Sequence, residues 1–154
     1  WVEVDPVYVA LTRGQNSSPA LVDIDNDGDL DLFVGEASGT MNFWLNEGSA
    51  ESPNFQLVSD TYLDIDIGRR SFPTFADLDG DGDFDMIIGS ELDGLYLYLN
   101  NGTPEVSDFV EWGILDLDVQ VISAPEFADI DGDGDLDLFV GGASGGVLFF
   151  RNEN

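Results

Sequence analysis

Three stretches of the chain carry the same dense pattern of aspartates. Each has an aspartate at every second position over nine residues, in "DIDNDGDLD", "DLDGDGDFD" and "DIDGDGDLD". Carboxylates packed this closely repel one another unless a cation neutralises them. Ca²⁺ suits such a loop because it takes roughly six to eight oxygen ligands in a flexible shell. The pattern therefore predicts three calcium sites, one in each loop.

The positions within each loop suggest separate roles. A tight loop can turn the side chains at positions 1, 3, 5 and 9 toward a common ion, while position 7 offers its backbone carbonyl. Glycine at position 6 allows a positive φ, which other residues adopt only with strain. Positions 1, 3, 5, 7 and 9 are Asp23, Asp25, Asp27, Asp29 and Asp31 in the first loop, Asp77, Asp79, Asp81, Asp83 and Asp85 in the second, and Asp129, Asp131, Asp133, Asp135 and Asp137 in the third; position 6 is Gly28, Gly82 or Gly134.

An EF-hand shares the opening of this pattern and is the first alternative. It needs a bidentate glutamate at position 12 and a helix on either side of the loop. Position 12 is Val34, Ile88 or Val140, each in the middle of an apolar segment. The EF-hand interpretation therefore fails.

The loops belong to a repeat of about 52 residues. They begin 54 and then 52 residues apart, at Asp23, Asp77 and Asp129. Each is preceded by a proline four residues upstream and followed by a glycine and an asparagine at fixed distances. These residues are Pro19, Pro73 and Pro125, then Gly35, Gly89 and Gly141, and then Asn46, Asn100 and Asn152.

Each repeat reads as four short strands. "PTFAD" leads into the acidic loop, "FDMIIG" follows it, and "GLYLYLNNG" is apolar on both alternating faces, so both faces must be covered. A more polar fourth segment precedes the next proline. Four strands, glycine and asparagine turns and a period near 50 predict an all-β fold of β-propeller blades.

The phase of the repeats predicts one repeat domain over residues 1–154. Residues 1–17 align with the fourth segments, so we expect a closing outer strand that completes the last blade of the same chain or of a partner chain. Blade 1 then covers 18–70, blade 2 covers 71–122, and blade 3 covers 123–154 with three strands. Since closed propellers have about four to eight blades, three blades favour self-association, either as a head-to-tail dimer forming a six-bladed ring or as a filament. The remaining blades of a longer chain are the other possibility.

The loop pattern D-x-D-x-D-G-x-x-D between the first and second strands of a blade resembles the FG-GAP or VCBS repeat. The likeness extends over all three loops, the leading "SSP", "SFP" and "SAP", and the strands "DLFVG" and "DMIIG". The literal Phe-Gly and Gly-Ala-Pro signatures are missing, so the chain is closer to the bacterial VCBS type than to an integrin. The resemblance implies a calcium-binding β-propeller with one Ca²⁺ at each loop, held by the side chains at positions 1, 3, 5 and 9 and the carbonyl at position 7.

Composition limits the function further. With 32 acidic and four basic residues, the chain repels nucleic acid and anionic membranes. No apolar run approaches the roughly 20 residues of a membrane helix. Without histidine, cysteine or lysine the chain is poorly equipped for catalysis, so we expect no enzyme. The acidic surface suits a salty, calcium-rich medium, which predicts a secreted or cell-surface location.

We therefore expect an extracellular module for adhesion, binding or self-assembly, in which the ions hold the blades. A carbohydrate-binding propeller and an accessory segment of a polysaccharide-degrading enzyme remain alternatives, with a protein or glycan as the ligand. Of the other residues, Trp44 is predicted to pack between blades, and Trp112 to lie near a loop. The Arg69–Arg70 pair is predicted to neutralise Asp64 and Asp66.

Overall fold

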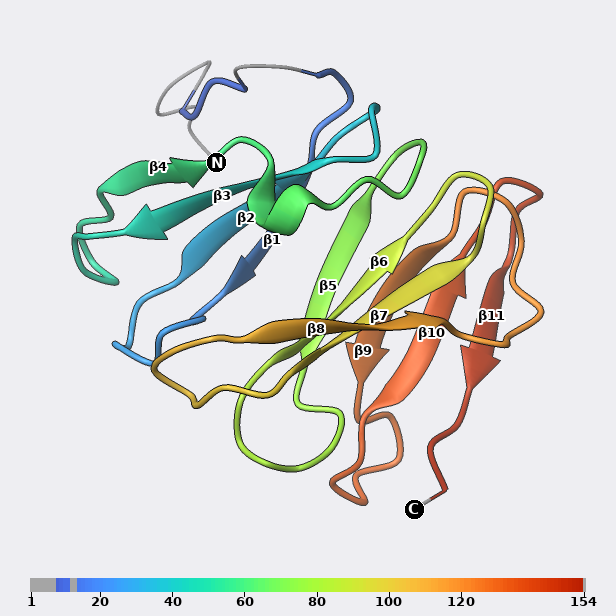
Figure 1. Ribbon diagram of the computed structural model, residues 1–154. Helices are drawn as coiled ribbons and strands as arrows, with labels where there is room; N and C mark the ends of the chain where they lie inside the picture. The colour runs from blue at the N-terminus through green and yellow to red at the C-terminus, as the bar shows by residue number, and fades with distance from the viewer. Residues whose placement is uncertain (1–7, 12–13, 154) are drawn as a thin grey trace.

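The computed structural model describes residues 8–11 and 14–153, which form three antiparallel sheets lying side by side (Figure 1). In each sheet the strands follow one another in chain order. The first sheet contains β1 (Ser18–Val22), β2 (Asp31–Gly35), β3 (Met41–Asn46) and β4 (Phe55–Ser59), the second contains β5 (Phe72–Ala76), β6 (Asp85–Gly89), β7 (Leu95–Asn100) and β8 (Phe109–Ile114), and the third contains β9 (Ala124–Ala128), β10 (Asp137–Gly141) and β11 (Val147–Phe150). The expectation of an all-β fold built from blade-like repeats is confirmed.

The second strand of the first sheet and that of the second sheet are apolar on both faces because both faces are covered. All five residues of β2 are buried, and so are all five of β6. Neighbouring residues of a strand point to opposite faces, so Phe33 and Val34 contribute to two different cores. The structure therefore assigns the two-sided apolar pattern to contacts with two neighbours.

The sheets pack face to face through these cores. Phe33 and Phe43 of the first sheet stack with ring centroids 4.4 Å apart, and Phe33 lies 4.7 Å from Phe75 of the second sheet. Between the second and third sheets, Ile87 and Leu95 share a core with Leu138 and Val140. We call the side of a sheet that meets the next sheet its trailing face, and the side that meets the preceding sheet its leading face.

The segments that join the sheets fill these same cores. After β4 the chain forms a short 3₁₀ turn, η1 (Tyr62–Asp64), and then buries Ile65 and Ile67 between the first and second sheets. After β8, Leu115, Leu117 and Val119 pack between the second and third sheets. Each connection is thus part of the contact between two sheets.

The predicted closing strand lies mostly outside the described residues, which omit 1–7, 12–13 and 154. Residues 8–11 and 14–17 adopt no strand, and Val9 and Leu11 pack against the leading face of the first sheet. Within 8–11 and 14–153, no helix is long and apolar enough to cross a membrane.

Candidate metal centres

The three acidic loops occupy equivalent places, each joining the first and second strands of a sheet. They lie at the lower edge of the molecule in Figure 1. Asp79 of the second loop and Asp135 of the third line one hollow of about 540 Å³, while Asp23 of the first loop and Asp83 of the second line a smaller one. Neighbouring loops therefore face each other across shared hollows.

The aspartate at position 1 organises each loop through backbone amides. In the second loop, the N–H groups of Gly80 and Gly82 donate to the two oxygens of Asp77, at 2.8 and 3.1 Å. Asp23 and Asp129 each accept two amides from their own loops in the same way. These bonds curl the chain around the first carboxylate.

Positions 5, 6 and 7 complete the turn. Oδ1 of Asp81 accepts the N–H of Asp83 at 3.1 Å, and the first and third loops repeat this bond. Gly82 has a φ of +96°, a conformation that favours glycine. The glycine expected at position 6 is thus required by the backbone.

The aspartate at position 9 starts the next strand and is bonded to two separate segments. The oxygens of Asp31 accept the N–H of Asn46 at 2.7 Å and that of Ile24 at 3.2 Å. In the same way, the carboxylate of Asp85 accepts the N–H groups of Asn100 and Leu78. The carboxylate of Asp137 accepts the N–H groups of Asn152 and Ile130. All three side chains are buried. Position 9 therefore ties the loop to the end of the third strand, whatever else it binds.

Each loop brings three carboxylates together. In every group, one ligand oxygen from each residue lies within 4.8 Å of the others. Three acidic clusters that could hold a metal ion are therefore present, at equivalent places in the three sheets. The groups are Asp23, Asp25 and Asp27; Asp77, Asp79 and Asp85; and Asp129, Asp131 and Asp133.

The remaining predicted ligands lie close by but are arranged differently. Position 9 joins the cluster only in the second loop, and position 5 only in the first and third. The side chains of Asp29 and Asp83 at position 7 are buried, whereas that of Asp135 is partly exposed.

Unpartnered buried oxygens show that the first and second loops fit a cation. Oδ1 of Asp25, Asp29 and Asp83 is buried without a hydrogen-bond partner. A buried carboxylate oxygen without a partner is costly, and a bound cation removes that cost. The donor set, which contains oxygen alone, suits a hard ion such as Ca²⁺.

The raised pKa values of several loop aspartates also fit a bound cation. Burial and the neighbouring Asp81 carboxylate raise the pKa of Asp83 to about 6. Burial raises the pKa of Asp31 to about 6 as well. The pKa of Asp25 is raised by burial and then by Asp27. Without a cation, these groups resist ionisation because their charges are crowded and partly desolvated.

The repeated asparagine has a role that its spacing alone does not reveal. Oδ1 of Asn46 accepts the N–H groups of Gly48 and Asn54, at 3.1 and 2.7 Å, and so holds the turn between β3 and β4. Asn100 does the same in the second sheet. The fixed distance from each loop to its asparagine was the signal in the sequence.

The arginine pair has a different partner from the one expected. Arg69 and Arg70 lie on the connection between the first two sheets, and each forms a 3.3 Å ion pair with Glu91. The expected pairing with Asp64 and Asp66 is wrong, because the turn after β6 brings Glu91 against this connection. Since Phe72 pairs with Gly89, the register of β5 and β6 carries both arginines beside Glu91, and the ion pairs lie at the end of the second sheet.

Two tryptophans, Trp44 and Trp112, differ in burial. Trp44 is 4% exposed, in a core on the leading face of the first sheet. Its partners are Val9 and Leu11 of the preceding segment rather than a second blade, so the predicted packing between blades is not confirmed. Trp112 lies within β8 and is 72% exposed. It stands two residues before the end of that strand, and its ring lies outside the buried cores.

Comparison with known proteins agrees with this geometry. A family model described as an FG-GAP-like repeat matches residues 23–88 and 77–140. Each match begins at the first aspartate of one loop and extends through the strand after the next loop. No curated protein and no solved structure matches the chain.

Proposed function

Since the chain belongs to the FG-GAP-like repeat family, we propose that it is a β-propeller-like module in which each acidic loop binds one Ca²⁺ ion. The ion stabilises its own blade, and the module works outside the cell, secreted or at the cell surface. There it serves adhesion, binding or assembly rather than catalysis.

The observation that carries the calcium proposal is the set of crowded carboxylates with unpartnered buried oxygens. Asp25 and Asp83 each hold such an oxygen next to two or more other carboxylates. Hydrogen bonds from backbone amides of the loop and of the end of β7 satisfy the carboxylates at positions 1 and 9 and fix the shape of the loop. A divalent cation supplies the charge that this arrangement lacks.

A structural role for the ion follows from how the loop is connected. Asp85 accepts a hydrogen bond from the N–H of Asn100 at the end of β7. An ion bound in the loop would therefore also stabilise the position of this strand. At a calcium concentration about 100 times the dissociation constant, each site would add roughly 2.7 kcal/mol to the free energy of unfolding. Three such sites would supply a large share of the roughly 5–15 kcal/mol typical of a domain.

The proposed location rests on charge and on calcium supply. The formal net charge is −28, and three bound Ca²⁺ ions would leave −22 (−28 + 3 × 2). Extracellular calcium modules bind weakly, at about 10⁻⁴–10⁻³ M, so they fill only where calcium is plentiful. We therefore place the module in such a medium.

Carbohydrate binding is the second candidate, and its support is narrow. Trp112 offers an exposed aromatic ring on β8, but the equivalent residue on β4 is Val58. An aromatic platform therefore does not recur from one sheet to the next. A glycan array with the calcium-loaded protein tests this role, and absence of binding would exclude it for the glycans displayed.

Isothermal titration calorimetry of calcium-stripped protein tests the metal proposal. We expect about three Ca²⁺ ions per chain, with Mg²⁺ binding more weakly because it demands a smaller octahedral shell. No heat of calcium binding, together with unchanged unfolding, would overturn the proposal.

A further inference from the structure

The two contacts between sheets within the chain use the same pair of surfaces. In the first contact, Phe33 and Phe43 on the trailing face of the first sheet meet Tyr62 and Phe75. In the second, Ile87 and Leu97 occupy the same register positions on the second sheet and pack against Leu138 and Val140. A trailing face thus takes a leading face together with the connection that precedes it.

In the part of the chain that the structure describes, the trailing face of the third sheet has no such cover. Register places Val147 where Met41 lies in the first sheet and Phe149 where Phe43 lies. Met41 and Phe43 are 0% and 7% exposed, whereas Val147 and Phe149 are 66% and 45% exposed. Phe139 and Phe149 form a ring pair, with centroids 4.9 Å apart, that repeats the buried pair of Phe33 and Phe43.

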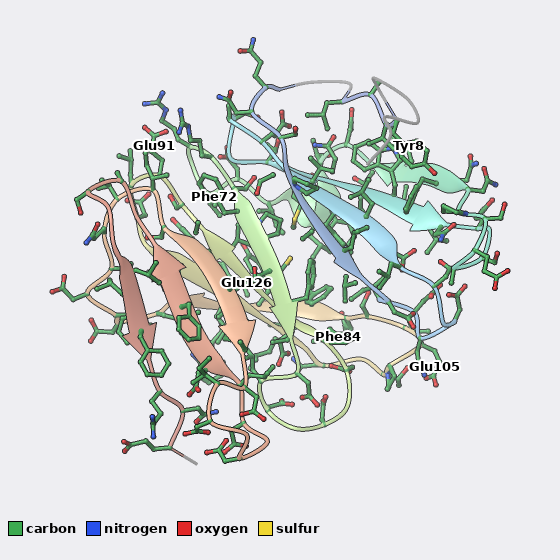
Figure 2. All side chains as sticks on the ribbon, turned by 180° about the vertical axis from the view of Figure 1, so that it is seen from behind. Tyr8, Phe72, Phe84, Glu91, Glu105 and Glu126 are labelled. Carbon is green, nitrogen blue, oxygen red and sulfur yellow. The ribbon has the colours of Figure 1, made fainter. Side chains whose placement is uncertain are left out.

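The leading face of the first sheet, at the other end of the row of sheets, also exposes apolar side chains. Tyr8 and Leu21 are 55% and 57% exposed there. Together with Leu30, Leu32 and Phe55 they line a mainly apolar hollow of about 400 Å³. In Figure 2, Tyr8 lies by the first sheet, on the far side of the molecule from the third sheet.

Tyr8 occupies the place that Tyr62 occupies one repeat later. Each stands eleven residues before the proline of the following strand. Each also meets the first residue of a fourth strand edge to face, with Tyr8 lying 5.9 Å from Phe55 and Tyr62 lying 6.5 Å from Phe109. Tyr62 packs on Phe33 and Phe43, but among residues 8–11 and 14–153 Tyr8 meets no equivalent pair.

We propose that the trailing face of the third sheet binds the leading face of the first sheet of a second copy of this chain. In that contact, Tyr8 of the second copy lies against Phe139 and Phe149, as Tyr62 lies against Phe33 and Phe43. The occupant is a second copy because the chain itself carries both complementary surfaces, one at each end of its row of sheets. The inference rests on the packing of the sheets and is independent of the calcium proposal.

Such a contact joins two different surfaces, so copies associate head to tail. A head-to-tail contact closes into a ring when the rotation allows it and otherwise builds a filament. Glu126 is the one carboxylate that register places directly opposite Phe139, and Thr74 holds the same place in the second sheet, where it is 7% exposed. Burial of Glu126 would weaken the contact. Glu126→Thr is therefore expected to tighten self-association.

Analytical ultracentrifugation in millimolar calcium tests the proposal with two variants, one for each surface. Tyr8→Ser removes the leading-face ring and Phe149→Ser removes the trailing-face ring. We expect the unmodified chain to form dimers or larger species and each variant alone to sediment as a monomer. Trp112→Ser is the matched control, because it deletes an exposed aromatic on β8 and should associate like the unmodified chain.

Mixing the variants gives the sharper result. The Tyr8→Ser chain keeps a sound trailing face and the Phe149→Ser chain keeps a sound leading face, so an equimolar mixture should form a dimer with one intact contact. Circular dichroism of each variant checks that it is folded. A monomeric unmodified chain, association that survives either substitution, or a mixture that stays monomeric while both variants are folded would each overturn the proposal.

Discussion

The N–H of Asn46 donates a 2.7 Å hydrogen bond to Oδ1 of Asp31, joining the end of β3 to the last position of the acidic loop. The same bond recurs between Asn100 and Asp85 at 2.8 Å, and between Asn152 and Asp137 at 2.9 Å. Its repetition in every sheet indicates a fixed part of the architecture. It also gives the position-9 aspartate a structural role of its own, which in the second loop Asp85 combines with a place in the metal-capable cluster.

Loss of the position-9 carboxylate should destabilise the protein with or without calcium. In Asp85→Ala, the amides of Leu78 and Asn100 lose their acceptor in a buried place. We expect a loss of about 1–3 kcal/mol in the free energy of unfolding for each amide left unsatisfied. Urea unfolding of the variant and of the unmodified chain, each calcium-stripped and calcium-loaded, measures this loss.

Asp79→Ala is the control for this effect, because Asp79 belongs to the same loop but is exposed. It should leave the calcium-free stability nearly unchanged and reduce only the gain from calcium. Equal losses from the two substitutions in calcium-free buffer would contradict the role assigned to Asp85.

A substitution at position 3 should change metal binding and calcium-free stability in opposite directions. Burial and the neighbouring Asp27 raise the pKa of the Asp25 carboxyl. Asp25→Asn removes that carboxylate, so the repulsion between the carboxylates of the calcium-free loop falls. We expect the calcium-free protein to gain stability while the number of bound Ca²⁺ ions falls from about three to about two. Calorimetry and thermal unfolding report the two effects.

Asp116→Asn serves as the control for charge alone, because Asp116 is exposed and lies outside the loops. It should bind as much calcium as the unmodified chain. If Asp25→Asn also retains the full number of ions, Asp25 is not a ligand.

The glycines at positions 4 and 6 of the loop should respond differently to substitution. Gly82 has a φ of +96° and a Cβ there would meet no atom within 4 Å, so Gly82→Ala costs only backbone strain, about 1–2 kcal/mol. Gly80→Asn should cost little, because Asn26 already holds that position in the first loop with a φ of 56°. Thermal unfolding of both variants compares them directly, and similar losses would contradict this account of the loop.

The calcium-free protein should become less stable as pH rises. The pKa values of Asp31 and Asp83 are about 6 in the folded state, above the ordinary value of 3.8. The folded protein therefore holds protons that the unfolded chain releases. The stability that these protons contribute is fully present below about pH 4 and is lost as pH rises through about 6. Calcium-stripped protein should thus have a higher melting temperature at pH 5 than at pH 7.

Excess calcium should reverse or flatten this trend, because protons compete with the ion for carboxylates. Asp83→Asn removes one of the two groups and should reduce the pH dependence in metal-free buffer. A calcium-free melting temperature that rises from pH 5 to pH 7 would show that these carboxyls are not destabilised by burial.

The sequence was sufficient to predict the blades and the loops. The period of the aspartates, the prolines and the two-faced strands are local patterns, and the sheets and clusters form where these patterns place them. The glycine of position 6 was also predictable, since a tight turn needs positive φ there.

The contacts between distant segments were not predictable. The bond from Asn46 to Asp31 spans 15 residues, and the pairing of Arg69 with Glu91 depends on the register in which β5 pairs with β6. The Arg69–Arg70 pair was assigned to Asp64 and Asp66 because sequence proximity was the available guide. The exposure of Phe149 also follows from the packing of whole sheets, since the matching Phe43 has the same residue type and is buried.

Thermal unfolding of the unmodified chain in calcium-stripped buffer and in millimolar calcium tests the central claim most directly, with equal concentrations of magnesium as the control for ionic strength. Millimolar calcium is about ten times a dissociation constant of about 10⁻⁴ M, so each of three sites would add roughly 1.4 kcal/mol. Together they correspond to a rise of about ten degrees in melting temperature for a chain of this size. We predict that calcium produces this rise and that magnesium produces much less of it. Equal melting temperatures in stripped and calcium-containing buffer would contradict the claim that the aspartate loops hold structural calcium.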